Sequence, residues 1–278
     1  MQLGDFEITH IRAGSYRWDG GSFFGVVPKT LWGRKSPTDE LNRIAVAFNS
    51  YIIRTGEHTV LVETGAGDKL DARSRERMSV PAEHEPLPSI IAAHGIDPES
   101  IDIVVNSHLH FDHSGGNTVM TGGRPQPAFP RARYFATRAE WVFAHRRHPR
   151  DSVSYNDNNY DPLVDSGHMT LVDPGHEVVP GVTMRLVPGH NPNMCVVMAE
   201  SGGRSFCFWA DLVPTASHTQ PTWVAAFDLD PIESIDQKTV WLGRAADEAW
   251  ICGFGHDPTV GLARIERDEK RQFRAVAL

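Results

Sequence analysis

The chain contains 278 residues, with 27 lysines and arginines against 35 aspartates and glutamates, and a formal net charge of −8 at pH 7. The charges are spread without long runs, which argues against nucleic-acid binding because that function needs a basic patch. No apolar run reaches the roughly 18 residues that cross a bilayer, and residues 1–5 lack the basic and apolar regions of a signal peptide. We therefore expect a soluble cytoplasmic protein that binds neither nucleic acid nor membrane.

The N-terminal part of the chain predicts strands separated by an irregular aromatic segment. Apolar patterns predict strands over 6–11, 44–53 and 59–62. The segment 18–32 is rich in glycine and aromatic residues and fits neither a helix nor a strand. Its aromatic residues, Phe24 and Trp32 among them, either pin a loop to the core or line a substrate pocket, and the sequence favours neither.

The middle of the chain predicts two helices and a long loop. A proline near the start and a glycine past the end predict a helix over 88–94, and a capping box at Thr137 predicts a second one through His145. Residues 146–168 have no hydrophobic period and predict a long loop, a kind of segment that often forms a lid or binding loop. Tyr155 in this loop is either a pocket residue or an ordinary loop anchor.

The C-terminal part predicts a second group of strands, over 177–186, 195–200, 205–209, 259–265 and 273–276. A capping box at Ser234 predicts a helix through Ala249. The loop after Asp211 carries His218 and Trp223, which are candidates for the pocket. For His218 the competing interpretation, a surface histidine with its hydrogen bonds satisfied, is favoured.

The stretch 107–116 carries four ligand-type side chains within six residues: His108, His110, Asp112 and His113. Neutral imidazole and carboxylate are ligands that zinc and similar divalent ions prefer. The apolar run 101–105 just before them predicts a buried strand, so these side chains should lie on a loop at the C-terminal end of a core strand. A cluster of surface histidines is the alternative, but the spacing favours a metal site.

This His-x-His-x-Asp-His spacing resembles the signature of the metallo-β-lactamase superfamily, whose members carry three further ligands, each at a strand end. His190, Asp211 and His256 are the matching candidates here. The resemblance covers nearly the whole chain and implies an α/β fold, a four-layer αββα sandwich of two mixed β-sheets with helices on the outer faces. Periodicity alone predicts only a mixed α and β protein. No linker or repeat interrupts the chain, so we expect a single domain over residues 1–278.

The resemblance also implies roles for these residues. One metal ion would be held by His108, His110 and His190, a second by Asp112, His113 and His256, and Asp211 would bridge the two. Glu63 stands where many members have the aspartate of an Asp-Thr-Gly sequence, and it would orient a histidine ligand. The expected cofactors are two divalent ions, zinc in the first place, with iron or manganese as alternatives.

Two such ions can hold a shared hydroxide as the nucleophile, and Asp112 could take up or return a proton beside it. An aspartate as the bridging residue resembles several hydrolase branches, of which the N-acyl homoserine lactone lactonases and methyl parathion hydrolases fit this chain. We expect a hydrolase that opens a lactone or cleaves an ester of a small-molecule substrate. The alternatives are a phosphotriester or aryl-ester hydrolase and an iron-dependent oxidoreductase, and a homodimer stays open.

Overall fold

The N-terminal half of the chain builds the first of two seven-stranded sheets, in the order β1-β2-β3-β4-β5-β8-β9. The computed structural model describes residues 1–81 and 84–278. The strands of this sheet are β1 (Gln2–Leu3), β2 (Phe6–Asp19), β3 (Arg43–Arg54), β4 (Thr59–Val62), β5 (Ile103–Val105), β8 (Arg133–Thr137) and β9 (Met169–Val172). The last four run parallel to one another. Their short apolar sequences suit this position, because parallel strands are covered on both faces.

The C-terminal half builds the second sheet, in the order β10-β11-β12-β13-β14-β15-β16. Its strands are β10 (Glu177–Val179), β11 (Val182–Leu186), β12 (Cys195–Ser201), β13 (Arg204–Phe208), β14 (Ile251–Gly253), β15 (Leu262–Asp268) and β16 (Gln272–Ala277). Only β13 and β14 pair in parallel among them. A separate hairpin joins β6 (Thr118–Thr121) to β7 (Arg124–Pro127).

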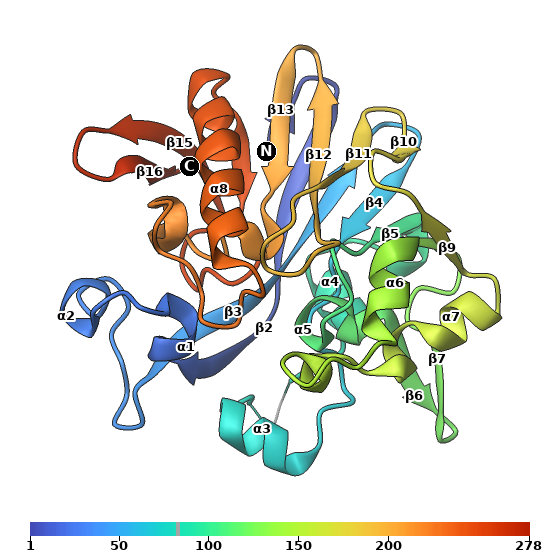
Figure 1. The fold of residues 1–278 in the computed structure, drawn as a ribbon. Coiled ribbons are helices and arrows are strands. Elements are labelled where there is room, and N and C mark those ends of the chain that lie inside the picture. Colours follow the sequence, from blue (N-terminus) through green and yellow to red (C-terminus); the bar gives the residue numbers. More distant parts are fainter. Residues whose placement is uncertain (82–83) are drawn as a thin grey trace.

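Helices cover the outer faces of both sheets (Figure 1). They are α1 (Gly20–Phe24), α2 (Lys29–Trp32), α3 (Ala72–Met78), α4 (Leu87–Ala93), α5 (Phe111–Ser114), α6 (Arg138–Ala144), α7 (Asp161–Asp165) and α8 (Pro231–Asp247). Helix α8 packs on β15, whereas α4, α6 and α7 pack on β2, β8 and β9. The inner faces of the two sheets share one core, in which Val62 and Phe206 are both fully buried. The predicted four-layer arrangement is therefore confirmed.

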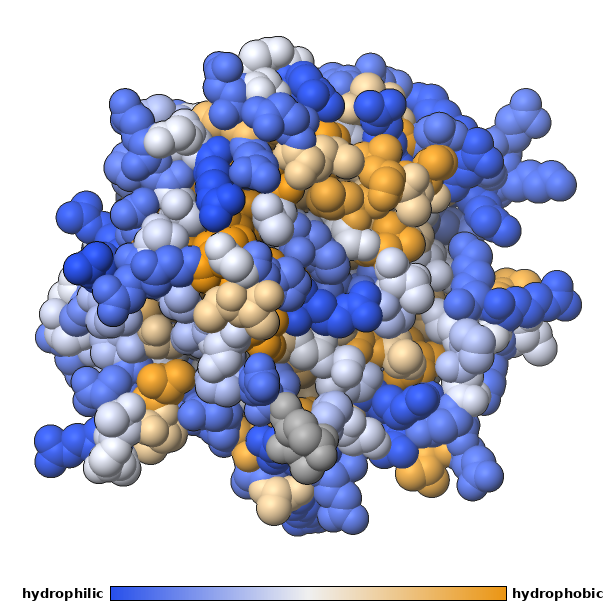
Figure 2. All heavy atoms as spheres, turned by 180° about the vertical axis from the view of Figure 1, so that it is seen from behind, coloured by the Kyte–Doolittle hydropathy of each residue, from blue (hydrophilic) through white to orange (hydrophobic). Residues whose placement is uncertain are grey.

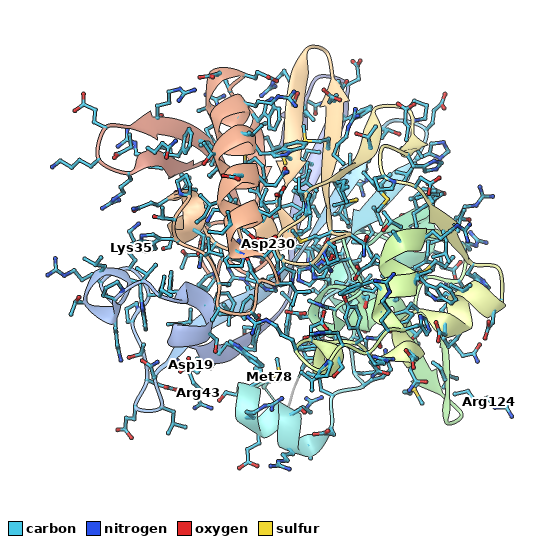
Figure 3. All side chains as sticks on the ribbon, viewed as in Figure 1. Asp19, Lys35, Arg43, Met78, Arg124 and Asp230 are labelled. Carbon is cyan, nitrogen blue, oxygen red and sulfur yellow. The ribbon has the colours of Figure 1, made fainter. Side chains whose placement is uncertain are left out.

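Several predicted boundaries are wrong for local reasons. The strand expected over 177–186 is a hairpin, because Gly181 turns the chain between β10 and β11 at φ +80°. The loop expected over 146–168 contains α7 and two short 3₁₀ turns. Helix α8 begins at Pro231, not at Ser234: the side chain of Asp230 accepts a hydrogen bond from the Glu233 amide and caps the helix (Figure 3). A proline directly after an aspartate suits this helix start.

The surface is mainly hydrophilic with hydrophobic patches between the charged groups, as the view from behind illustrates (Figure 2). Within residues 1–81 and 84–278, no helix has the length and apolar character needed to cross a bilayer.

Candidate metal centre

Loops at the ends of four strands bring the predicted ligands together at one edge of the sandwich. The loops that carry them follow β5, β11, β13 and β14, and Glu63 follows β4 directly. Because β4 and β5 are parallel, as are β13 and β14, each pair delivers its loops to the same edge of its sheet. Side chains that are far apart in the sequence therefore meet there.

The seven predicted ligands form two groups. In the first, ligand atoms of His108, His110 and His190 lie within 4.8 Å of one another, and in the second those of Asp112, His113 and His256 do so. Within the groups, His190 Nε2 lies 3.1 Å from His110 Nδ1, and His256 Nε2 lies 3.1 Å from His113 Nε2. Each group could hold one ion.

Asp211 lies between the two groups. Its Oδ1 is 3.2 Å from His113 Nε2 and 3.1 Å from His256 Nε2. Its Oδ2 is 3.4 Å from His190 Nε2. The carboxylate thus faces both groups, which is the placement expected of a bridging ligand. The residue before it, Ala210, has a left-handed φ of +48°, so the backbone is strained where it turns Asp211 toward the histidines.

Hydrogen bonds on the far side of the rings fix which nitrogen faces the centre. His256 Nδ1 donates to the carbonyl of Ala47 at 2.9 Å. His190 Nδ1 donates to Asp228 Oδ1 at 3.1 Å, and Asp228 Oδ2 accepts from Ser234 Oγ at 2.7 Å. The Nε2 lone pairs of neutral His256 and His190 therefore point inward.

Three of the predicted ligands have a buried atom without a hydrogen-bond partner within the described part of the chain. These atoms are His108 Nε2, His110 Nε2 and Asp211 Oδ1. Buried polar atoms are normally satisfied, and acceptors at contact distance need a cation or a proton between them. The donor set of imidazoles and carboxylates is also what divalent zinc prefers. The residues present therefore fit a pair of metal ions.

The electrostatics differ between the two groups. Burial, and then the neighbouring imidazoles, hold the pKa values of His108 and His110 well below the ordinary histidine value. Burial also lowers the pKa of His113, but the carboxylates of Asp211 and Asp112 outweigh it and raise that pKa well above the ordinary value. Although burial raises the pKa of Asp211, the surrounding histidines hold it well below its usual range. Asp211 is therefore an anion at neutral pH.

Glu63 contacts the ligand loop at two points. Its Oε1 accepts a hydrogen bond from the Ser107 amide at 2.7 Å, and its Oε2 lies 3.5 Å from His113 Nδ1. The backbone of Glu63 is left-handed, with φ +62°, which is uncommon for a residue other than glycine. This geometry is the one expected of a carboxylate that orients a histidine.

Sequence analysis missed Glu140, a buried carboxylate that joins the loops around the first group. Its Oε1 accepts hydrogen bonds from the Leu109 amide at 3.0 Å, the Tyr155 hydroxyl at 3.0 Å and Asn191 Nδ2 at 3.2 Å. The capping box at Thr137 predicted the helix correctly, since Thr137 Oγ1 accepts from the Glu140 amide. The carboxylate of Glu140, however, points into the core. A glutamate in a capping box does not indicate that its carboxylate will be buried and will join two loops of a metal site.

A cavity of about 240 Å³ opens onto the metal-site side chains. Besides His110, Asp112, His190, Asp211 and His256, its wall is formed by aromatic and polar residues and one valine: Tyr16, Trp18, Ser22, Phe23, Phe111, Arg150, Asp151, Val153, Ser154 and Phe227. Its size and aromatic lining suit a small organic molecule with an apolar part.

The structure places the four pocket candidates Phe24, Trp32, His218 and Trp223 in the core, and none of them is in the wall of this cavity. The ring of Phe24 stacks between those of Trp32 and His218, at 4.9 and 4.6 Å. Phe23 and Phe24 are neighbours on the short helix α1, so their side chains point in different directions. The orientation of α1 toward the core decides that Phe23 and not Phe24 faces the cavity, and this orientation cannot be predicted from the local sequence.

His218 and Tyr155 each contact a residue that lines the cavity, Phe23 and His110 respectively. His218 Nε2 donates to the carbonyl of Phe23 at 2.8 Å, and its Nδ1 lies 2.7 Å from Thr215 Oγ1. Burial lowers the pKa of His218 to about 3, so the ring is neutral. Its hydrogen bonds are satisfied, as the favoured interpretation expected, but the ring lies in the core and not on the surface. Tyr155 also lies outside the cavity wall, with its ring 4.7 Å from that of His110.

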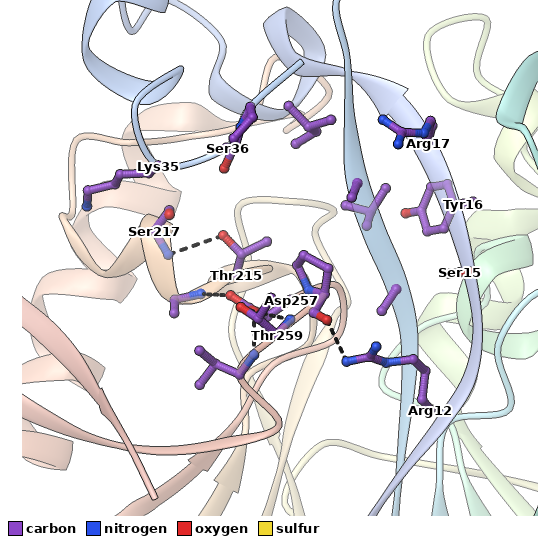
Figure 4. Close-up of a pocket in the computed structure, with 18 of the residues that line it drawn as sticks. Arg12, Ser15, Tyr16, Arg17, Lys35, Ser36, Thr215, Ser217, Asp257 and Thr259 are labelled. Carbon is purple, nitrogen blue, oxygen red and sulfur yellow. Dashed lines mark hydrogen bonds between the residues drawn. The ribbon is translucent and has the colours of Figure 1, made fainter. Parts of the chain in front are cut away.

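A second, larger cavity of about 680 Å³ has Arg12, Tyr16, Lys35 and Asp257 in its wall (Figure 4). Arg12, Arg17 and Lys35 line it, and it contains none of the seven predicted ligands. Tyr16 is common to the walls of both cavities. We assign the chemistry to the smaller cavity, because five of the seven predicted ligands line it.

The chain matches known proteins both in sequence and in fold. Residues 45–270 match the family model described as the Metallo-beta-lactamase superfamily. The chain is 27% identical over 160 residues to an N-acyl homoserine lactonase of Bacillus cereus, which covers 54% of this chain and 57% of that protein. The chain thus spans little more than half the length of this curated relative.

Two solved structures share the fold over the whole chain. A probable metal-dependent hydrolase from Staphylococcus aureus superposes with a TM-score of 0.88 at 27% identity, covering 100% of this chain and 99% of that one. AidC, a dizinc quorum-quenching lactonase in complex with its N-hexanoyl homoserine product, superposes with a TM-score of 0.81 at 21% identity, covering 100% and 96%. At 21% identity the second comparison supports the fold alone.

Proposed function

Because the chain belongs to the metallo-beta-lactamase superfamily, we propose that it is a hydrolase that opens a lactone or cleaves an ester at a dinuclear metal centre. One observation carries the proposal. The Nε2 atoms of His113 and His256 lie 3.1 Å apart, each 3.2 Å or less from Asp211 Oδ1. His256 Nδ1 already donates to Ala47, so its Nε2 offers a lone pair, and a cation between these groups satisfies all three.

The residues divide between two ions as their positions suggest. One ion would be held by His108, His110 and His190, the other by Asp112, His113 and His256, with Asp211 shared. Two bound divalent ions would lower the pKa of a water between them and polarise the carbonyl of the substrate. Zinc is the metal we propose, because imidazole and carboxylate suit it and the lactonase AidC is a dizinc protein.

The chain's own residues supply orientation and proton transfer. Asp112 lines the cavity and its side chain is 17% exposed, so it can take up a proton from the attacking water and return it to the leaving oxygen. Asp211 is buried and ionised, which suits a ligand better than a proton carrier. Asp228 and Glu63 hold the far sides of His190 and His113 and keep their inner nitrogens aimed at the centre.

The cavity supports a lactone or ester of modest size. Trp18, Phe23, Phe111 and Phe227 give it an apolar wall that would take an acyl chain. The same aromatic wall would also accept an aryl leaving group, and this favours an aryl-ester or phosphotriester hydrolase as the second candidate. We also propose that residues 1–278 form one domain, because the two sheets share a core.

The experiment that tests the function is a substrate panel with the purified protein, stripped of metal and reloaded with zinc. The panel contains N-acyl homoserine lactones, simple lactones, aryl esters and a phosphotriester. We expect fast turnover of lactones that depends on zinc and is lost on chelation. A preference for aryl esters or phosphotriesters would select the second candidate, and no zinc-dependent turnover of any of them would contradict both.

A further inference from the structure

The larger cavity carries an excess of positive charge that the proposed hydrolysis does not use. Arg12, Arg17 and Lys35 line it, and Asp257 is the one acid among the described residues of its wall. Three cations and one carboxylate give this wall a formal charge of +2, in a chain whose net charge is −8. Figure 4 shows Arg12 and Arg17 on strand β2 at one side of the cavity and Lys35, from the loop after α2, at the other.

The carboxylate of Asp257 is occupied by the loops around it. Its Oδ1 accepts hydrogen bonds from the amides of Thr259 and Val260, at 2.9 and 2.7 Å, and from Thr259 Oγ1 at 3.1 Å. Its Oδ2 accepts from the amide of Ala216 at 2.9 Å. Asp257 therefore holds the loop after His256 against the loop after Asp211, and it forms no ion pair with the three described cations of the wall.

These three cations have no acid to pair with in residues 1–81 and 84–278. Arg12 donates to the carbonyl of Pro258 at 2.5 Å, which leaves other N–H groups of its guanidinium free. Lys35 Nζ lies 4.8 Å from the centre of the Trp223 ring, a contact that leaves its N–H donors available to a ligand. The cavity thus offers several charged donors whose bonds are still to be made.

Lys35 illustrates what an unpaired cation costs here. At another place on the surface Arg43 has an acid beside it, with Nε 2.9 Å from Asp39 Oδ2. For Lys35, partial burial and then the like charge of Arg271 lower the pKa, and Asp268 offsets only part of this. The charged form of Lys35 is therefore poorly stabilised by the protein, and an anion in the cavity would supply the missing stabilisation.

The remainder of the wall suits the body of a small organic molecule. Hydroxyl groups of Ser15, Ser36 and Ser217 can donate to anionic oxygens, and Ile44 and Val260 provide apolar surface. The volume of about 680 Å³ lies within the range of small-molecule sites. Charge, donors and size therefore point to the same kind of ligand.

We propose that this cavity binds a small organic dianion, a phosphate monoester or a dicarboxylate, at Arg12, Arg17 and Lys35. Guanidinium groups match the oxygens of phosphate and carboxylate in paired hydrogen bonds, and two negative charges balance the charge of the wall. The inference is independent of the proposed hydrolysis, because none of the seven predicted metal ligands lines this cavity.

Calorimetric titration with three probes tests the site: phenyl phosphate, phenylsuccinate and, as a neutral control, benzyl alcohol. Each is titrated into the zinc-loaded protein and into the protein stripped of metal, because bound metal ions also attract anions. We expect both dianions to bind the stripped protein at one site that persists after zinc loading, with a Kd that rises as salt is added. Benzyl alcohol should not bind. The dianion with the lower Kd decides between a phosphate and a dicarboxylate ligand.

Variants locate the binding. Arg17→Gln and Lys35→Gln should each raise the Kd of the better probe by about tenfold or more, the usual weight of a hydrogen bond to a charged group, and the double variant should abolish binding. Both residues lie at the surface, so the circular dichroism spectrum should not change. Arg54→Gln removes the same charge from an arginine that pairs with Glu7 outside this wall, and it should leave the Kd unchanged.

Three results would overturn the proposal. They are the absence of binding by either dianion, binding that occurs only with zinc, and a Kd that is the same in the wild type and in the Arg17 and Lys35 variants. Binding only with zinc would assign the anion to the metal centre, whereas an unchanged Kd would place it elsewhere on the surface.

Discussion

Glu140 Oε1 accepts a hydrogen bond at 3.0 Å from the backbone amide of Leu109, the residue between His108 and His110. The same oxygen binds Asn191, the neighbour of His190. One carboxylate in helix α6 therefore spans both loops that carry the first group of histidines. We therefore expect Glu140 to position that group through the Leu109 amide and the Asn191 side chain.

Replacing Glu140 tests this connection. We expect Glu140→Gln to lower metal affinity or turnover by about 10–100-fold, the usual cost of losing a group that orients ligands. The amide oxygen accepts more weakly than a carboxylate, so both loops loosen while the fold persists. Tyr155→Phe removes only one donor to Glu140 and should have a smaller effect. Metal content and kcat are the measurements, and wild-type values for Glu140→Gln would remove it from the site.

Glu140 should also give the metal-free protein a characteristic pH dependence. Burial raises the pKa of Glu140 to about 7 from its ordinary value of 4.5. The folded state therefore binds this proton more tightly than the unfolded state, and this contribution to stability decreases as pH rises from 4.5 to 7. Over this pH range, the contribution of Glu140 to the free energy of unfolding falls by about 3 kcal/mol. Urea unfolding at pH 5 and pH 7 should show a larger loss of stability for wild type than for Glu140→Gln, and parallel losses would contradict this.

Asp211 is the residue whose loss should damage both groups at once. We expect Asp211→Ala to lose bound metal and to reduce turnover by orders of magnitude, because its carboxylate faces histidines of both groups. The surrounding strands do not depend on it, so the circular dichroism spectrum should stay that of the wild type. Full metal occupancy together with intact turnover would show that Asp211 is not a ligand.

Glu63→Gln should have a milder effect than any change of a ligand. The amide can still accept the hydrogen bond from Ser107, but it no longer stabilises charge on His113. We expect activity to fall by about 10–100-fold, less than for Asp211→Ala measured in the same assay. Activity equal to that of the wild type would show that Glu63 does not support His113.

His218 distinguishes a structural role from a pocket role. His218→Ala removes a fully buried ring that stacks on Phe24 and a donor to Phe23. We expect the free energy of unfolding to decrease by about 3 kcal/mol, from the cavity and the unpaired carbonyl, while metal content is retained. A wild-type denaturation midpoint combined with altered substrate preference would return His218 to the pocket.

The sequence by itself determined the metal-site side chains as candidates and a mixed α and β fold, whereas the αββα arrangement was implied only by the family resemblance of the His-x-His-x-Asp-His spacing. His108, His110, Asp112 and His113 lie within six residues, and His190, Asp211 and His256 each follow a strand-like run. Ligand chemistry and strand ends are local properties, which one sequence contains. The hairpin at Gly181 and the start of α8 at Asp230 are also local, but competing turn and capping signals obscured them.

Only the tertiary structure decided which other side chains meet the site. Phe23 lines the cavity and Phe24 does not, because the helix that carries both has one orientation toward the core. Glu140 is an ordinary acid in the sequence, and only the packing of distant loops buries it against Leu109 and Asn191, the neighbours of His110 and His190. Burial and proximity arise from long-range packing, so no local pattern could identify these residues.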